Sequence, residues 1–129
     1  MNNFTQILDK PKNIALLKLR EFVLSSIKKE ISDFNNDLSD LHNFVQKKDV
    51  NDLRLSLFNL INSKIEWENL ILDICGDDLK YKHGSDLLVQ SKINLSIQMP
   101  NDETSVLPIH TDSSSADSPF QSNIWIPLT

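Results

Sequence analysis

The hydrophobic pattern of this chain changes its period near residue 90, and that change constrains the fold more than any other feature. Between residues 9 and 75, apolar side chains recur every three or four positions, which is typical of helices with one buried face. From Ile93 to Met99, apolar and polar residues alternate strictly, which indicates a strand with one buried face. The pattern therefore predicts an α+β fold in which helices precede strands.

Four helices are expected, at residues 9–31, 37–45, 49–62 and 63–75. The last should end at Gly76, because glycine tolerates the positive φ that often follows a helix. Trp67 lies in the apolar stripe of this helix and is expected in the core. Cys75, the one cysteine, is expected as a small buried thiol, which favours a reducing compartment.

A His-x-Asp pair follows the predicted strand, and a second predicted strand runs over residues 123–128. Side chains two positions apart project to the same side of an extended backbone, so His110 and Asp112 can reach one metal ion. Two imidazoles and one carboxylate form the ligand set of non-haem Fe(II) oxygenases, and no second histidine follows His110. The alternative is a surface loop in which His110 is solvated and Asp112 makes an Asx turn.

The run from Ile93 to Leu128 holds four motifs, of which the second contains this pair: Ser96-Ile97-Gln98-Met99-Pro100-Asn101-Asp102, Leu107-Pro108-Ile109-His110-Thr111-Asp112, Asp117-Ser118-Pro119-Phe120 and Trp125-Ile126-Pro127-Leu128. Together they resemble the first half of the double-stranded β-helix (jelly roll) core of Fe(II)/2-oxoglutarate-dependent dioxygenases. Within that superfamily they are most similar to the phytanoyl-CoA dioxygenase-like group, and closest to the oxygenases of sporadic bacterial carbohydrate-biosynthesis clusters.

The resemblance implies that His110 and Asp112 are two of the iron ligands, and that Asn94 and Gln98 line the pocket of the co-substrate 2-oxoglutarate. It also implies one domain over residues 1–129, helical over 1–80, with the start of the β-helix core over 85–129. The C-terminal half of that core, which would supply the distal histidine, is absent. A second chain that brings the missing strands is therefore an expected partner.

The implied function is that of an Fe(II)- and 2-oxoglutarate-dependent hydroxylase acting on a small molecule, with surface carbohydrate biosynthesis as its setting. Such an enzyme couples oxidative decarboxylation of 2-oxoglutarate to oxidation of a substrate C–H bond. Because the chain ends before the core is complete, two alternatives stay open. One is a non-catalytic truncated remnant, and the other is an interaction module that uses its exposed strand edge.

Composition and charge exclude several other classes of protein. The 129 residues carry a formal net charge of -5, with no basic stripe backed by aromatic residues, so a nucleic-acid partner is not expected. No run of 18 apolar residues and no signal-peptide pattern occurs, so neither a membrane span nor secretion is expected. The sequence predicts a soluble cytoplasmic protein.

Overall fold

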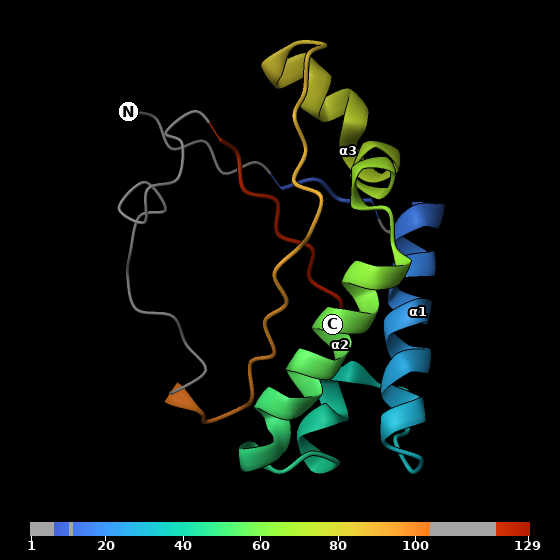
Figure 1. Cartoon of the computed structure of the whole chain (residues 1–129), viewed down its shortest axis with the longest axis vertical. Coiled ribbons are helices and arrows are strands. Elements are labelled where there is room, and N and C mark those ends of the chain that lie inside the picture. The colour runs from blue at the N-terminus through green and yellow to red at the C-terminus, as the bar shows by residue number, and fades with distance from the viewer. Residues whose placement is uncertain (1–6, 11, 104–120) are drawn as a thin grey trace.

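The computed structural model describes residues 7–10, 12–103 and 121–129. Its described part contains the α-helices α1 (Ile14–Glu30), α2 (Val50–Lys64) and α3 (Trp67–His83), and the short 3₁₀ helices η1 (Leu38–Asn43) and η2 (Lys47–Asp49). Helix α1 packs against both α2 and α3. After α3 the chain is extended, and Figure 1 shows residues 86–99 running down the side of the helices.

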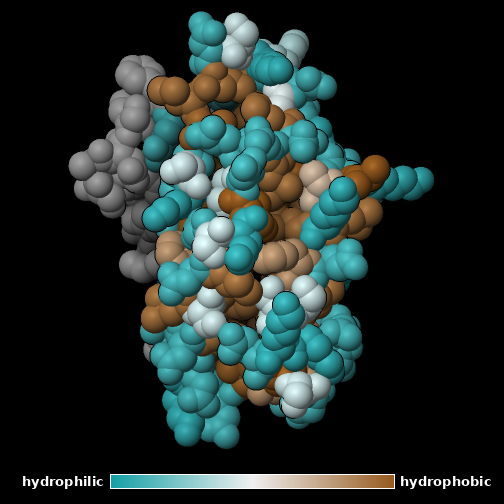
Figure 2. Space-filling model, turned by 45° about the vertical axis from the view of Figure 1, so that its right-hand side comes forward, coloured by the Kyte–Doolittle hydropathy of each residue, from teal (hydrophilic) through white to brown (hydrophobic). Residues whose placement is uncertain are grey.

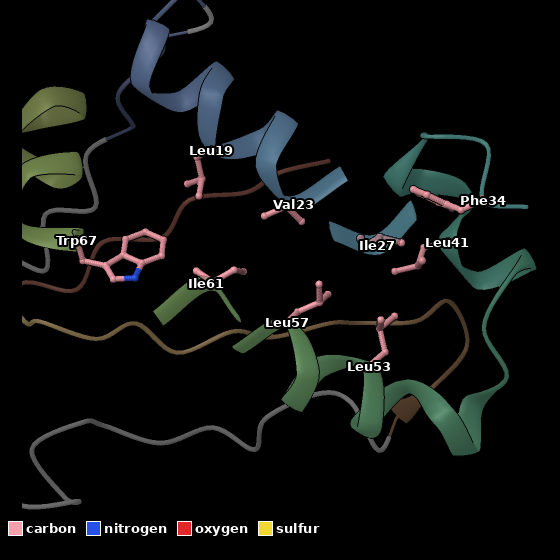
Figure 3. Packing of buried hydrophobic residues seen from close by; sticks show 9 residues of the cluster. All are labelled: Leu19, Val23, Ile27, Phe34, Leu41, Leu53, Leu57, Ile61 and Trp67. Carbon is pink, nitrogen blue, oxygen red and sulfur yellow. The ribbon is translucent and has the colours of Figure 1, made fainter. Parts of the chain in front are cut away.

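The core lies where one apolar stripe of each helix meets the others. Figure 3 shows side chains from α1, η1, α2 and the start of α3 converging on a common interior, together with Phe34 from the loop after α1. Phe34 is fully buried, and its ring meets that of Phe44 edge-on with centroids 5.5 Å apart. The main cluster consists of Leu19, Val23, Ile27, Phe34, Leu41, Leu53, Leu57, Ile61 and Trp67.

Helix α1 begins at a side-chain cap that also ties it to α3. The Asn13 side-chain oxygen accepts a hydrogen bond of 3.0 Å from the Leu16 amide, which satisfies one of the free N–H groups of the first turn. The Asn13 side-chain nitrogen, Nδ2, donates to the Asp73 backbone carbonyl at 3.1 Å. One residue therefore fixes both the start of α1 and its position beside α3.

The outer side of α1 keeps some apolar surface in contact with water. Ile14 and Leu17 on α1 and Leu72 on α3 are exposed, while Leu19 and Val23 of α1 are buried. Figure 2, which brings the α1 side forward, shows brown apolar patches between teal polar side chains. Such mixed exposure is ordinary for a protein surface, about half of which is apolar.

The predicted helices over 9–31 and 49–62 are confirmed within a few residues as α1 and α2. The segment 37–45 forms the tighter 3₁₀ helix η1. The predicted stop at Gly76 is confirmed in part: the helical backbone breaks next to it, at Cys75 (φ -143°, ψ 21°), but α3 resumes after this kink and ends at His83. The glycine with positive φ is Gly84, at 88°, and its amide donates to the Lys80 carbonyl at 2.9 Å.

The expected α+β fold, with the first strands of a double-stranded β-helix after the helices, is wrong. No residue in 7–10, 12–103 or 121–129 lies in a strand, and the described fold is helical. The alternation itself is real, since Ile93, Leu95 and Ile97 are half-buried against the helical core while the residues between them are exposed. The segment satisfies its apolar side by packing on helices, and no second backbone in the described part forms a ladder with it.

The C-terminal segment 121–129 packs on the same core. Ile126 and Leu128 are half-buried against it, and their neighbours Trp125 and Pro127 are exposed. The Arg20 side chain of α1 donates from Nε to the Leu128 carbonyl at 3.0 Å. The extended segments 93–99 and 121–129 are therefore both held to the helices by one apolar face and by a polar helix side chain that bonds their backbone.

Candidate functional site

The predicted iron ligands His110 and Asp112 lie outside the described residues. Their assignment stays a prediction from the sequence. Within the described ranges, no group of three or more His, Cys, Asp or Glu side chains comes together as a metal site. Of the other two histidines, His42 lies in η1 with Nδ1 3.0 Å from the Ser39 carbonyl oxygen, and His83 ends α3.

The predicted co-substrate residues Asn94 and Gln98 lie on the exposed side of the segment 93–99. This agrees with the expectation that they share a polar face. Their role in co-substrate binding stays a prediction from the sequence.

Asn62, near the end of α2, forms hydrogen bonds with the backbone at the start of this segment. Its side-chain oxygen accepts from the Ile93 amide at 2.8 Å, and its side-chain nitrogen donates to the Ile93 carbonyl at 3.1 Å. The same nitrogen also donates to the Phe58 carbonyl at 3.0 Å. This paired contact imitates the exchange of two hydrogen bonds between opposite residues of an antiparallel sheet.

Sequence reasoning missed Asn62, although a signal was available. Asparagine competes with the helical backbone for hydrogen bonds and is disfavoured inside helices, so its presence near the end of α2 called for an external partner. The partner, Ile93, is 31 positions away, and nothing in the local pattern identifies it. The start of the extended segment is thus positioned by a helix side chain.

A surface hollow of about 290 Å³ lies at the far end of the same segment, eight positions before His110 in the sequence at its nearest residue. The Lys47 ammonium and the Asp102 carboxylate, which both line it, form an ion pair at 2.7 Å, and the Asp102 side chain is largely buried. His42 also borders the hollow. Its lining consists of His42, Val45, Lys47, Met99, Pro100, Asn101 and Asp102.

The remaining titratable contacts near α3 are structural. The Lys10 ammonium donates to the Asp78 carboxylate, and this hydrogen bond raises the pKa of Lys10. Burial raises the pKa of the Cys75 thiol, whose Sγ lies 3.4 Å from the Ile71 carbonyl. Because the thiolate is the nucleophilic form, these surroundings suppress the reactivity of Cys75.

Among the residues that the structure describes, one buried side-chain donor has no hydrogen-bond partner. Trp67 is only 3% exposed, which confirms its predicted place in the core. Its indole Nε1 is buried and makes no hydrogen bond with the described residues. Figure 3 shows this nitrogen on the ring edge that is turned toward the extended segment. Leaving a buried N–H unpaired costs roughly 1–3 kcal/mol. Trp67 is therefore held in the described core by apolar packing, without a hydrogen bond from its indole N–H.

No protein-family model, curated protein or solved structure matches this chain. No helix in the part of the chain that the structure describes is long and apolar enough to cross a membrane. The functional assignment therefore depends on the residues of the chain itself.

Proposed function

We propose that this chain belongs to an Fe(II)- and 2-oxoglutarate-dependent oxygenase that hydroxylates a small, sugar-linked molecule. The observation that carries the proposal is the run from Ile93 to Leu128, in which His110 and Asp112 stand two positions apart among motifs that resemble this superfamily. The alternating exposure of residues 93–99 supports it, because a polar face opposite an apolar one is what a pocket wall requires.

The donor set fits the metal in its chemistry. A neutral imidazole and a carboxylate are two of the three protein ligands that hold non-haem Fe(II) and leave positions open for small ligands. His110 would supply the first imidazole nitrogen and Asp112 the oxygen, and the second imidazole would come from a second chain. Bound iron with 2-oxoglutarate supplies the oxidising chemistry, namely decarboxylation of the keto acid and oxidation of a substrate C–H bond.

The chain's own residues would bind and orient the co-substrate. Gln98 is the better placed of the two predicted amides, because it directly precedes the residues that line the hollow. Lys47 is the cation at that hollow, and it is already paired with Asp102. A dicarboxylate at this end of the segment would compete with Asp102 for the Lys47 ammonium.

The test is an anaerobic titration of the purified chain with Fe(II) in the presence of 2-oxoglutarate. A weak visible charge-transfer band is expected when the keto acid chelates protein-bound iron, and it should be lost in His110→Ala. His83→Ala is the matched control, because it removes an exposed histidine of α3 whose Nε2 lies 2.9 Å from Ser122 Oγ. A folded chain that gives no band, or an equal band in His110→Ala, would refute the proposal.

A further inference from the structure

Within the described part of the chain, the first residue of the extended segment 93–99 bonds α2 through its backbone. In an extended backbone, the N–H and C=O of one residue point to the same edge, and those of the next residue point to the opposite edge. Both backbone groups of Ile93 bond Asn62 of α2, so the groups of Leu95 and Ile97 also face the α2 side. The backbone groups of Asn94, Ser96 and Gln98 therefore form the edge that points away from α2. We call this the outer edge.

The outer edge makes no hydrogen bond within the described part of the chain. Figure 1 shows α2 on one side of the lower half of this segment and no helix on the other. Donors and acceptors on one strand edge repeat at about 6.6 Å, twice the rise per residue, and another extended backbone matches that repeat. The partner that fits the outer edge is therefore a strand.

Nothing in the sequence of this segment protects the edge. Proteins block free strand edges with charged residues, prolines or bulges, because an open edge recruits other strands. Residues 93–99 contain no charge and no proline, and Pro100 follows only after the alternating run has ended. The exposed side chains on this segment, Asn94, Ser96 and Gln98, are uncharged hydrogen-bonding groups.

We propose that the outer edge pairs with the same edge of a second copy of this chain, antiparallel and centred on Ser96. This register is self-complementary. Ser96 then faces Ser96 of the second copy, and Asn94 faces Gln98, so that hydroxyl meets hydroxyl and amide meets amide on the exposed face. All three positions are hydrogen-bonded pairs, in which opposite residues exchange both backbone bonds.

The apolar face supports the same register. Leu95 lies opposite Ile97 of the second copy, and Ile93 lies opposite Met99, so the half-buried side chains of both copies form one continuous apolar surface against the helices. Each copy carries a formal net charge of -5, but the paired segments contribute no charge to the contact. A second copy is thus favoured over a charged peptide, because every cross-strand pair joins residues of matching chemistry.

The test is sedimentation velocity of the full chain from micromolar to millimolar concentration, with charges placed at the centre of the pairing. The wild-type chain should form dimers. Ser96→Lys and Ser96→Glu each place like charges opposite one another, so each should weaken dimerisation roughly fivefold. An equimolar mixture of the two variants should dimerise again, because lysine then faces glutamate.

Ser85→Lys is the control, since Ser85 is exposed and precedes the paired segment. It adds the same charge as Ser96→Lys and should leave dimerisation unchanged, while far-UV circular dichroism verifies that every variant folds. A wild-type chain that stays monomeric throughout would overturn the proposal, as would dimers that Ser96→Lys affects no more than Ser85→Lys. Failure of the mixture to dimerise would overturn the register centred on Ser96. These outcomes do not depend on iron, so they are independent of the proposed oxygenase function.

Discussion

Replacing Asn62 with alanine should loosen the extended segment from α2 and lower the stability of the chain. The change removes two hydrogen bonds to the Ile93 backbone, at 2.8 and 3.1 Å, and each is worth about 0.5–1.5 kcal/mol net. Alanine regains roughly 0.5 kcal/mol through its higher helix propensity. The third bond, to the Phe58 carbonyl, is within the helix and largely exchanges with water. The expected loss is therefore about 0.5–2.5 kcal/mol.

Two assays report on this change at different scales. Urea unfolding followed by far-UV circular dichroism gives the free energy of unfolding, and hydrogen exchange of the Ile93 amide gives the local opening of the segment. Exchange at Ile93 should accelerate, because its N–H then has only water as a partner. Protection of amides in the middle of α2 should fall only by the global loss of stability.

Asn69→Ala provides the matched control. Asn69 is an exposed asparagine in α3 whose side chain donates to the nearby Glu66 carboxylate at 2.7 Å. It gains the same helix propensity on replacement, so its stability should change by no more than about 0.5 kcal/mol. If Asn62→Ala costs no more than Asn69→Ala and Ile93 exchange is unchanged, then Asn62 does not anchor the segment.

Three further predictions test the core, an acid-sensitive cap and the thiol. Phe34→Ala should cost about 3–5 kcal/mol in urea unfolding, because Phe34 is fully buried, and a loss below about 1 kcal/mol would contradict the packing. Hydrogen bonds from Ser39, first from its side chain and then from its backbone, lower the pKa of Asp37; its stabilisation is therefore present above the unfolded pKa and is lost as pH falls through the folded value. Ser39→Ala should raise the pKa of Asp37 toward the model-peptide value of 3.8, measured by NMR titration, and an unmoved pKa would contradict this cause. Cys75 should react with a disulfide reagent only after urea is added, because it is buried and its pKa is raised; rapid reaction of the native chain would contradict its burial.

The candidate site shows how far residue patterns extend. Alternation correctly placed Asn94 and Gln98 on the exposed side of their segment, because the choice between apolar and polar side chains is made residue by residue. It could not reveal Asn62, whose contact with Ile93 joins two parts of the chain 31 positions apart. His110 and Asp112 lie outside the described residues, so their pairing is known only as a spacing in the sequence.

The sequence by itself determined the local periods of this chain. The helical spacing in α1 and α2, the burial of Trp67 and Cys75, and the two-sided character of residues 93–99 all follow from the free energy of removing apolar side chains from water. That free energy depends on which face of a helix or extended segment is apolar, and the apolar face can be identified directly from the sequence.

Only the tertiary structure decided what each apolar face packs against. Alternation of apolar and polar residues indicates that one side of a segment is buried. A sheet also requires a second backbone at hydrogen-bonding distance. In the described chain that role at Ile93 is taken by Asn62, and the apolar side chains from Ile93 to Ile97 pack on helices instead. Likewise Gly76 has the residue type of a helix end, and the helical backbone does break beside it at Cys75, yet α3 resumes and ends at His83. Pairing and termination both depend on contacts between distant residues, which no local pattern contains.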